Sequence, residues 1–164
     1  MPINDPKEIF LLLLSNLRHG AERMTKIYQE IGTVVQDQDV KETLESRAFI
    51  SGKTLEKLDE CFRLIGEKPV KPTGRLHDIF VEDFRKELGE IQSPRARRLF
   101  VLAKIHHLIN LRKAEYEVLI AAADLTGHYG VGVLLESCLA DKVALGERTR
   151  RLIRERLIER VASA

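Results

Sequence analysis

Four polar or very small residues interrupt otherwise apolar series along the chain, and they are the first candidates for chemistry. The series repeat at alternating spacings of three and four residues, which is typical of the buried stripe of an amphipathic helix. The interruptions are Gly20, Ser51, Arg112 and Asp141. An arginine and an aspartate inside a helical protein favour an internal ion pair, for which small neighbouring residues would leave room.

The heights of these residues follow from two turns, one centred near residue 36 and one near residue 128. Residues equidistant from the turn of an antiparallel hairpin lie side by side, so Arg112 is expected near Asp141. The same geometry places four small residues of the first hairpin at one level: Gly20, Ala21, Ser51 and Gly52. We predict that Arg112 and Asp141 form an ion pair in the core, beside these small residues. The alternative is that Arg112 extends along its helix and keeps its charged head in water.

Helical patterns account for most of the chain. Asp5 followed by Pro6 is a typical helix start, and Gly66 is a typical stop. A second start is Ser93 followed by Pro94. Long helices are therefore expected over 6–32, 40–65, 94–125 and 131–161, with a shorter one over 76–91.

These elements predict an all-α fold in a single domain spanning residues 1–164. Short turns should make the long helices into two antiparallel hairpins, which a crossover over residues 67–93 would join. A four-helix bundle with one crossover is the ferritin-like arrangement. The best candidate for a strand, Val131–Leu135, is too short to change this interpretation.

Composition excludes several classes of protein. The chain has 44% hydrophobic and 32% charged residues, which suits a folded domain, and its net charge of +2 gives no indication of nucleic-acid binding. The longest apolar run, Ile9–Leu14, is far shorter than the roughly 20 residues that a membrane span needs. Cys61 and Cys138 lie on apolar series and are predicted to be buried free thiols, which favours a cytoplasmic location.

A di-metal centre in such a bundle needs carboxylates and histidines at mid-height. Only Asp141 is a potential ligand there, and Arg112 would put a positive charge where the metal belongs. We therefore predict neither metal nor cofactor. The pair His106–His107 does not change this, because adjacent helical residues point about 100° apart. We expect one of the two to be partly buried and the other to lie at the surface.

Arginines crowd the last helix: Arg148, Arg150, Arg151, Arg154, Arg156 and Arg160. Interleaved glutamates permit pairs such as Glu147–Arg151, so a solvated, self-paired helix is the preferred interpretation. The remaining interpretation is a surface that contacts anions or nucleic acid. Arg95, Arg97 and Arg98 form a smaller cluster that we interpret in the same way.

Apolar residues outside the four core-facing series suggest a second packing surface. They are Leu11, Leu12, Leu14, Leu111, Ile120 and Leu139. Because monomers rarely leave large apolar areas in water, we predict a homodimer that meets through the flanks of the long helices.

Several segments resemble the YciE/YciF family of bacterial ferritin-like proteins. They include the runs 8–16, 21–25 and 56–59, the pair Glu115–Tyr116, the turn 121–127 and the segment 134–139. The resemblance implies a ferritin-like four-helix bundle, usually dimeric, of poorly defined function and associated with stress responses.

The resemblance also implies where metal ligands would stand if this chain kept them. The corresponding positions are Ala21, Phe49 with Gly52, Ile109 with Arg112, and Asp141 with Gly146. Almost every expected ligand is absent, so no ligand is assigned to this chain.

The sequence therefore favours a non-catalytic, structural or stress-associated dimer. It indicates no small-molecule substrate. One alternative is a di-iron or manganese oxidase or an iron-handling protein with atypical ligands, such as Glu22, Glu45, Asp141 and a histidine. A weaker alternative is anion or nucleic-acid binding through the arginine-rich last helix.

Overall fold

The computed structural model describes residues 3–162, with the side chains of this range except Val34 and 156–162. Its five helices are α1 (Pro6–Val34), α2 (Gln38–Ile65), α3 (Leu76–Glu90), α4 (Pro94–Leu125) and α5 (Tyr129–Ala162). The predicted all-α class and all five helical segments are confirmed. The turns are tighter than predicted, because α1 continues two residues beyond Gly32 and α5 begins at Tyr129.

Local side-chain chemistry sets the helix ends. The Asp5 carboxylate accepts a hydrogen bond from the backbone nitrogen of Lys7 at 2.9 Å, as expected for a helix N-cap. Asp37 caps α2 in the same way through the backbone nitrogen of Val40 at 3.1 Å. Gly66 ends α2 with φ of +70°, a left-handed conformation that side chains with a Cβ rarely adopt.

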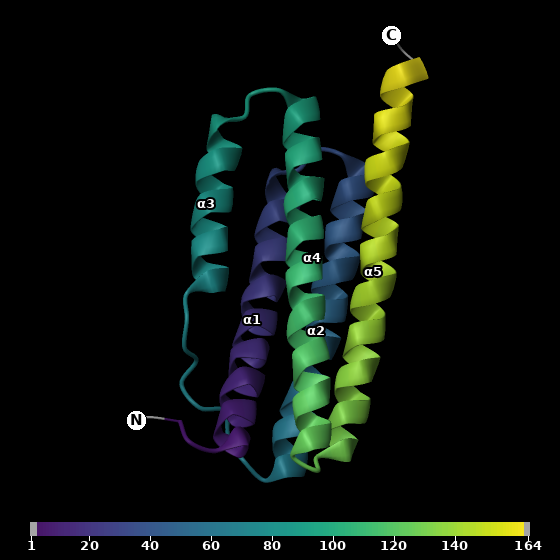
Figure 1. The fold of residues 1–164 in the computed structure, drawn as a ribbon. Coiled ribbons are helices and arrows are strands. Elements are labelled where there is room, and N and C mark those ends of the chain that lie inside the picture. The colour runs from purple at the N-terminus through teal and green to yellow at the C-terminus, as the bar shows by residue number, and fades with distance from the viewer. Residues whose placement is uncertain (1–2, 163–164) are drawn as a thin grey trace.

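The four long helices form the predicted bundle (Figure 1). α1 packs against α2 and α4 packs against α5, and the contacts of α2 with α5 and of α1 with α4 join the two hairpins. The crossover leaves the lower end of α2, returns along the outside of the bundle as α3, and enters α4 at the upper end. There α3 contacts α1 and α4. This arrangement is consistent with a ferritin-like bundle.

The apolar core is divided into two clusters along the bundle axis. The lower cluster includes Phe10, Leu17, Phe62, Tyr116 and Cys138. The upper cluster includes Met24, Leu44, Leu88, Val101 and Ile109. Between them lie the buried polar and charged side chains, which are mainly Arg47, Ser51, Thr54, Arg112 and Lys142. The middle of the bundle is therefore a polar layer.

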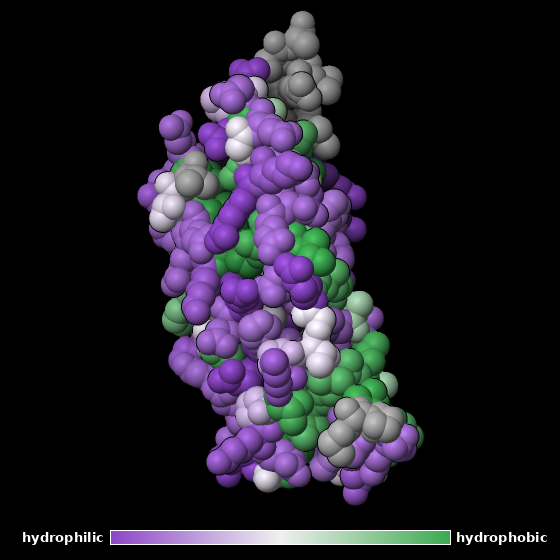
Figure 2. Space-filling view, turned by 90° about the vertical axis from the view of Figure 1, so that its left-hand side faces the viewer, coloured by the Kyte–Doolittle hydropathy of each residue, from purple (hydrophilic) through white to green (hydrophobic). Residues whose placement is uncertain are grey.

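The surface is largely hydrophilic on the side that Figure 2 shows, with hydrophobic atoms gathered toward its lower part. Within the described part of the chain, no helix combines the length and the apolar character that crossing a bilayer requires. Cys61 and Cys138 are both buried free thiols, as predicted.

Candidate functional site

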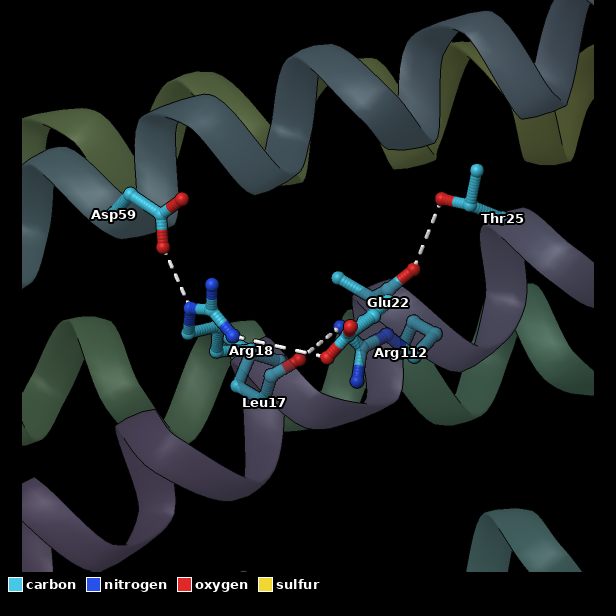
Figure 3. Close-up of polar contacts among 7 residues, drawn as sticks. Leu17, Arg18, Glu22, Thr25, Asp59 and Arg112 are labelled. Atoms are coloured by element: carbon cyan, nitrogen blue, oxygen red, sulfur yellow. Dashed lines mark hydrogen bonds and ion pairs between the residues drawn. The ribbon is translucent and has the colours of Figure 1, made fainter. Parts of the chain in front are cut away.

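Arg112 occupies the predicted core-facing position on α4, and only 2% of its surface is exposed. Its Nη2 donates a hydrogen bond to the backbone oxygen of Leu17 on α1 at 2.8 Å (Figure 3). Its Nη1 donates to Oε2 of Glu115 at 2.6 Å, three residues along the same helix. The guanidinium therefore joins the two hairpins of the bundle instead of extending into water.

The predicted ion pair between Arg112 and Asp141 is not formed, because each residue has another partner. Asp141 lies on the flank of α5 that faces α2, where its Oδ2 is 3.2 Å from Nζ of Lys57. Its side chain is 44% exposed. Lys142, one position further along, occupies the core-facing position that the sequence pattern assigned to Asp141. The error is thus a shift of one residue in the face of α5.

The four small residues of the first hairpin have different surroundings. Gly20 lies directly against Arg112 and against His77 of α3, and a Cβ added to Gly20 would overlap Nη1 of Arg112 and stand 2.9 Å from Cε1 of His77. Ala21 and Ser51 are buried. Gly52 is half-buried, and a Cβ added there would have no neighbour within 4 Å. Gly20 is therefore the one of these four residues that must lack a side chain to make room for the guanidinium.

His77 brings the crossover helix into the same group of residues. Its Nε2 lies 3.7 Å from Oε1 of Glu115. Burial, together with the nearby charge of Arg112, lowers the pKa of His77 to about 4. Burial also raises the pKa of Glu115, although Arg112 opposes that shift. At neutral pH the group therefore contains an uncharged imidazole beside one guanidinium–carboxylate pair.

Arg47 on α2 is a second buried arginine that the sequence interpretation missed. Its side chain is fully buried, and its Nη2 donates to the backbone oxygen of Leu145 at 3.1 Å and to Oγ1 of Thr149. Burial lowers the pKa of Arg47, while the neighbouring Tyr28 opposes the shift. Its Nε and Nη1 have no hydrogen-bond acceptor among the described residues. Burying donor atoms without an acceptor is costly.

Lys142 is the third buried base, with 7% of its surface exposed. Burial lowers its pKa to about 8, and the charges of Arg112 and Arg47 act in the same direction. The only carboxylate bonded to any of the three buried bases among the described side chains is Glu115. The polar layer is therefore rich in positive charge, the opposite of the charge that metal ligands supply.

Sequence signals for Arg47 and Lys142 were weak, because arginine and lysine are the residue types least expected at core positions. Between Leu44 and Leu58, the buried positions of α2 are Arg47, Ser51 and Thr54, and none of them is apolar. A search for apolar periodicity therefore loses the buried face over this stretch. A stricter heptad alignment of α2 with α5 is the signal that could have found both bases.

Other candidate residues remain apart from this layer. His106 is partly buried and His107 is exposed, as predicted. Glu22 pairs with Arg18, which also donates to Asp59 at 2.6 Å on the surface between α1 and α2 (Figure 3). Glu45 is exposed on α2. Among the described residues, no three histidine, cysteine, aspartate or glutamate side chains gather into a group that could hold a metal ion.

On the last helix, Arg148, Arg150, Arg151 and Arg154 are exposed. Glu147 was predicted to pair with Arg151, but it pairs with Arg150 instead, at 2.8 Å. The side chains of Arg156 and Arg160 lie outside the described residues. Self-pairing on α5 is thus present, with a different arginine.

Comparisons with known proteins give a family and two solved structures of similar fold. The family model described as "Domain of unknown function (DUF892)" matches residues 5–162. The structure of the Escherichia coli stress protein YciF has a TM-score of 0.89 at 15% identity, over 94% of this chain and 98% of that chain. The structure of YcfI, a proposed structural protein from Rhodopseudomonas palustris, has a TM-score of 0.86 at 22% identity, over 90% of this chain and 94% of that chain. No curated protein matches the sequence. Because the family model spans nearly the whole chain, this protein belongs to the DUF892 family, in agreement with its resemblance to the YciE/YciF proteins.

Proposed function

We propose that this protein is a non-catalytic, structural member of its family that forms a homodimer and has no di-metal centre. The observation that carries the proposal is the burial of Arg47, Arg112 and Lys142 inside the bundle, where the charges of both arginines act on Lys142. Three bases in a low-dielectric interior repel a divalent cation, and each would have to be neutralised or displaced before a metal could bind. The names of YcfI and YciF, a proposed structural protein and a stress protein, support the same role.

Metal analysis tests the absence of a di-metal centre. The full chain is purified without chelator and measured by inductively coupled plasma mass spectrometry, alongside its oxygen consumption with ferrous iron. We expect far less than one equivalent of iron or manganese and no oxygen consumption above the buffer rate. A metal content of about two equivalents per chain, which is what di-metal bundles hold, would contradict the proposal.

The residues predicted to form the dimer surface differ in burial. Leu14 is fully buried in the monomer, whereas Leu11, Leu12, Leu111, Ile120 and Leu139 are half-buried. Large apolar side chains that remain exposed near the lower end of the bundle are Ile9, Leu64, Leu125, Tyr129 and Val133. Because such residues at one end of a monomer are unfavourable in water, we propose that the second copy covers this end.

Light scattering coupled to size-exclusion chromatography tests this contact. We expect the mass of a dimer for the wild-type chain and of a monomer for Val133→Glu. The matched control is Phe49→Glu, because Phe49 is 68% exposed and Val133 is 65% exposed, but Phe49 lies on α2 away from that end. A monomeric wild-type chain, or equal masses for both variants, would overturn the proposed contact.

A further inference from the structure

The connections from α1 to α2 and from α3 to α4 both lie at the upper end of the bundle (Figure 1). Residues of these connections and of the start of α4 line a cavity of about 460 Å³. This volume is within the range of small-molecule sites. Val35 and Pro94 give the lining accessible apolar surface, the core residues Leu88 and Val101 also border it, and Gln36 and Gln92 contribute amide groups. The cavity is well separated along the bundle axis from the polar layer, so it is independent of the structural role proposed above.

Three arginines line one side of this cavity, namely Arg95, Arg97 and Arg98. Arg98 forms an ion pair with Asp37, which also lines the cavity. Arg95 and Arg97 are exposed, and no carboxylate on a described side chain forms an ion pair with either of them. The cavity therefore carries three guanidinium groups and one carboxylate, an excess of positive charge.

The position of the arginines on α4 adds to that excess. They lie in the first turns of the helix, whose N-terminus carries the positive end of the helix dipole. Helices normally place acidic residues there, but the first turn of α4 contains none. The arrangement is unfavourable without a negative charge in front of it, and a bound anion would supply that charge.

We propose that this cavity binds an organic phosphate of about the size of a mononucleotide. Guanidinium groups bind phosphate through paired hydrogen bonds, so Arg95 and Arg97 hold the phosphate group. The organic part of the ligand packs against Val35 and Pro94, the accessible apolar residues of the lining. The accessible apolar lining is the reason to assign an organic phosphate rather than inorganic phosphate, which would leave Val35 and Pro94 in contact with water.

Isothermal titration calorimetry with the full chain tests the proposal at constant ionic strength. The probes are adenosine 5′-monophosphate, ribose 5-phosphate, inorganic phosphate and uncharged adenosine. We expect the first two to bind more tightly than inorganic phosphate, and adenosine to bind at least tenfold more weakly than its monophosphate. Binding of inorganic phosphate as tight as that of the organic phosphates would overturn the assignment of an organic ligand.

Three variants locate the binding. The double variant Arg95→Gln/Arg97→Gln should weaken the affinity for adenosine 5′-monophosphate by at least about tenfold. Arg63→Gln is the matched control, because Arg63 is an exposed arginine at the lower end of α2, and it should bind as the wild type does. Gln92→Trp places a large side chain in the cavity and should weaken binding of the monophosphate more than binding of inorganic phosphate.

All the substituted residues are exposed, so each variant should fold, and its helical circular dichroism verifies this. Equal affinities of the double variant, the control and the wild type would overturn the site. Dissociation constants above the millimolar range for every phosphate probe would overturn it as well.

Discussion

Nη2 of Arg112 lies 2.8 Å from the backbone oxygen of Leu17, so a side chain of the second hairpin is hydrogen-bonded to the main chain of the first. Helical carbonyl oxygens already accept bonds within their own helix, and a second donor to such an oxygen must approach the backbone closely. Gly20 on α1 permits the approach, because it has no Cβ in the path of the guanidinium. Glu115 then supplies the negative charge that the buried arginine needs.

Replacing Arg112 by leucine should lower the free energy of unfolding by about 3 kcal/mol, because Glu115 loses its partner in a largely buried position. Urea denaturation followed by circular dichroism measures the change. The double variant Arg112→Leu/Glu115→Leu should recover part of the loss. Arg18→Leu is the control, since the exposed pairs of Arg18 contribute at most about 1 kcal/mol. Equal losses for Arg18→Leu and Arg112→Leu would contradict the buried pair.

Gly20→Val should destabilise the protein by roughly 1–3 kcal/mol, because the added atoms overlap Arg112 and His77. Gly52→Ala is a glycine substitution in open space within α2, and it should be neutral or stabilising by up to about 1 kcal/mol. Thermal unfolding of the two variants and the wild type gives the comparison. The packing around Gly20 would be in doubt if Gly20→Val melted at the wild-type temperature.

His77 should make stability fall with acid. Its pKa is about 4 in the folded chain and 6.5 ordinarily, so the unfolded chain binds more protons between these values. Stability is fully present above pH 6.5 and is lost as the pH falls toward 4. From pH 7 to pH 5 the loss should be about 1–2 kcal/mol.

Denaturant titrations of His77→Gln between pH 5 and pH 7.5 measure this contribution, and the variant should show a shallower slope than the wild type. His107→Gln is the control, because His107 is exposed on α4. If the slopes of His77→Gln and the wild type coincided, the imidazole would not be the group that titrates.

Lys142→Met should stabilise the protein by about 1–3 kcal/mol at pH 7, because it removes a charge that burial disfavours. The folded pKa of about 8 lies below the ordinary 10.5, so the wild type gains stability as the pH rises through this interval. The advantage of the variant should therefore shrink by pH 10.5. Lys26→Met, at an exposed position on α1, should show no such pH dependence, and equilibrium unfolding at both pH values tests it. A loss of stability in Lys142→Met at pH 7 would disprove the penalty.

The sequence pattern was sufficient for the helices, the crossover and the core position of Arg112, because periodic apolar residues and helix caps are local signals. It was not sufficient for the partner of Arg112. On α5 two series with spacings of three and four fit almost equally well, one through Asp141 and one through Lys142. The choice between them depends on how α5 packs against α2, which no local pattern records.

The role of His77 was equally hidden. It lies on the crossover helix, and its burial depends on α3 docking beside α1 and α4. The upper cavity is likewise formed by two connections that are distant in the chain, since Asp37 and Arg98 meet only after folding. Such groups follow from tertiary contacts rather than from spacing.

The bond from Arg112 to Leu17 has a consequence for how the two hairpins align. Apolar stripes with repeats of three and four residues can slide past each other by two turns and still bury leucine against leucine. A guanidinium that must meet one carbonyl oxygen beside one glycine allows a single alignment, because any slip would leave the charge in hydrocarbon. The arginine thus fixes the axial register of one helical hairpin relative to the other.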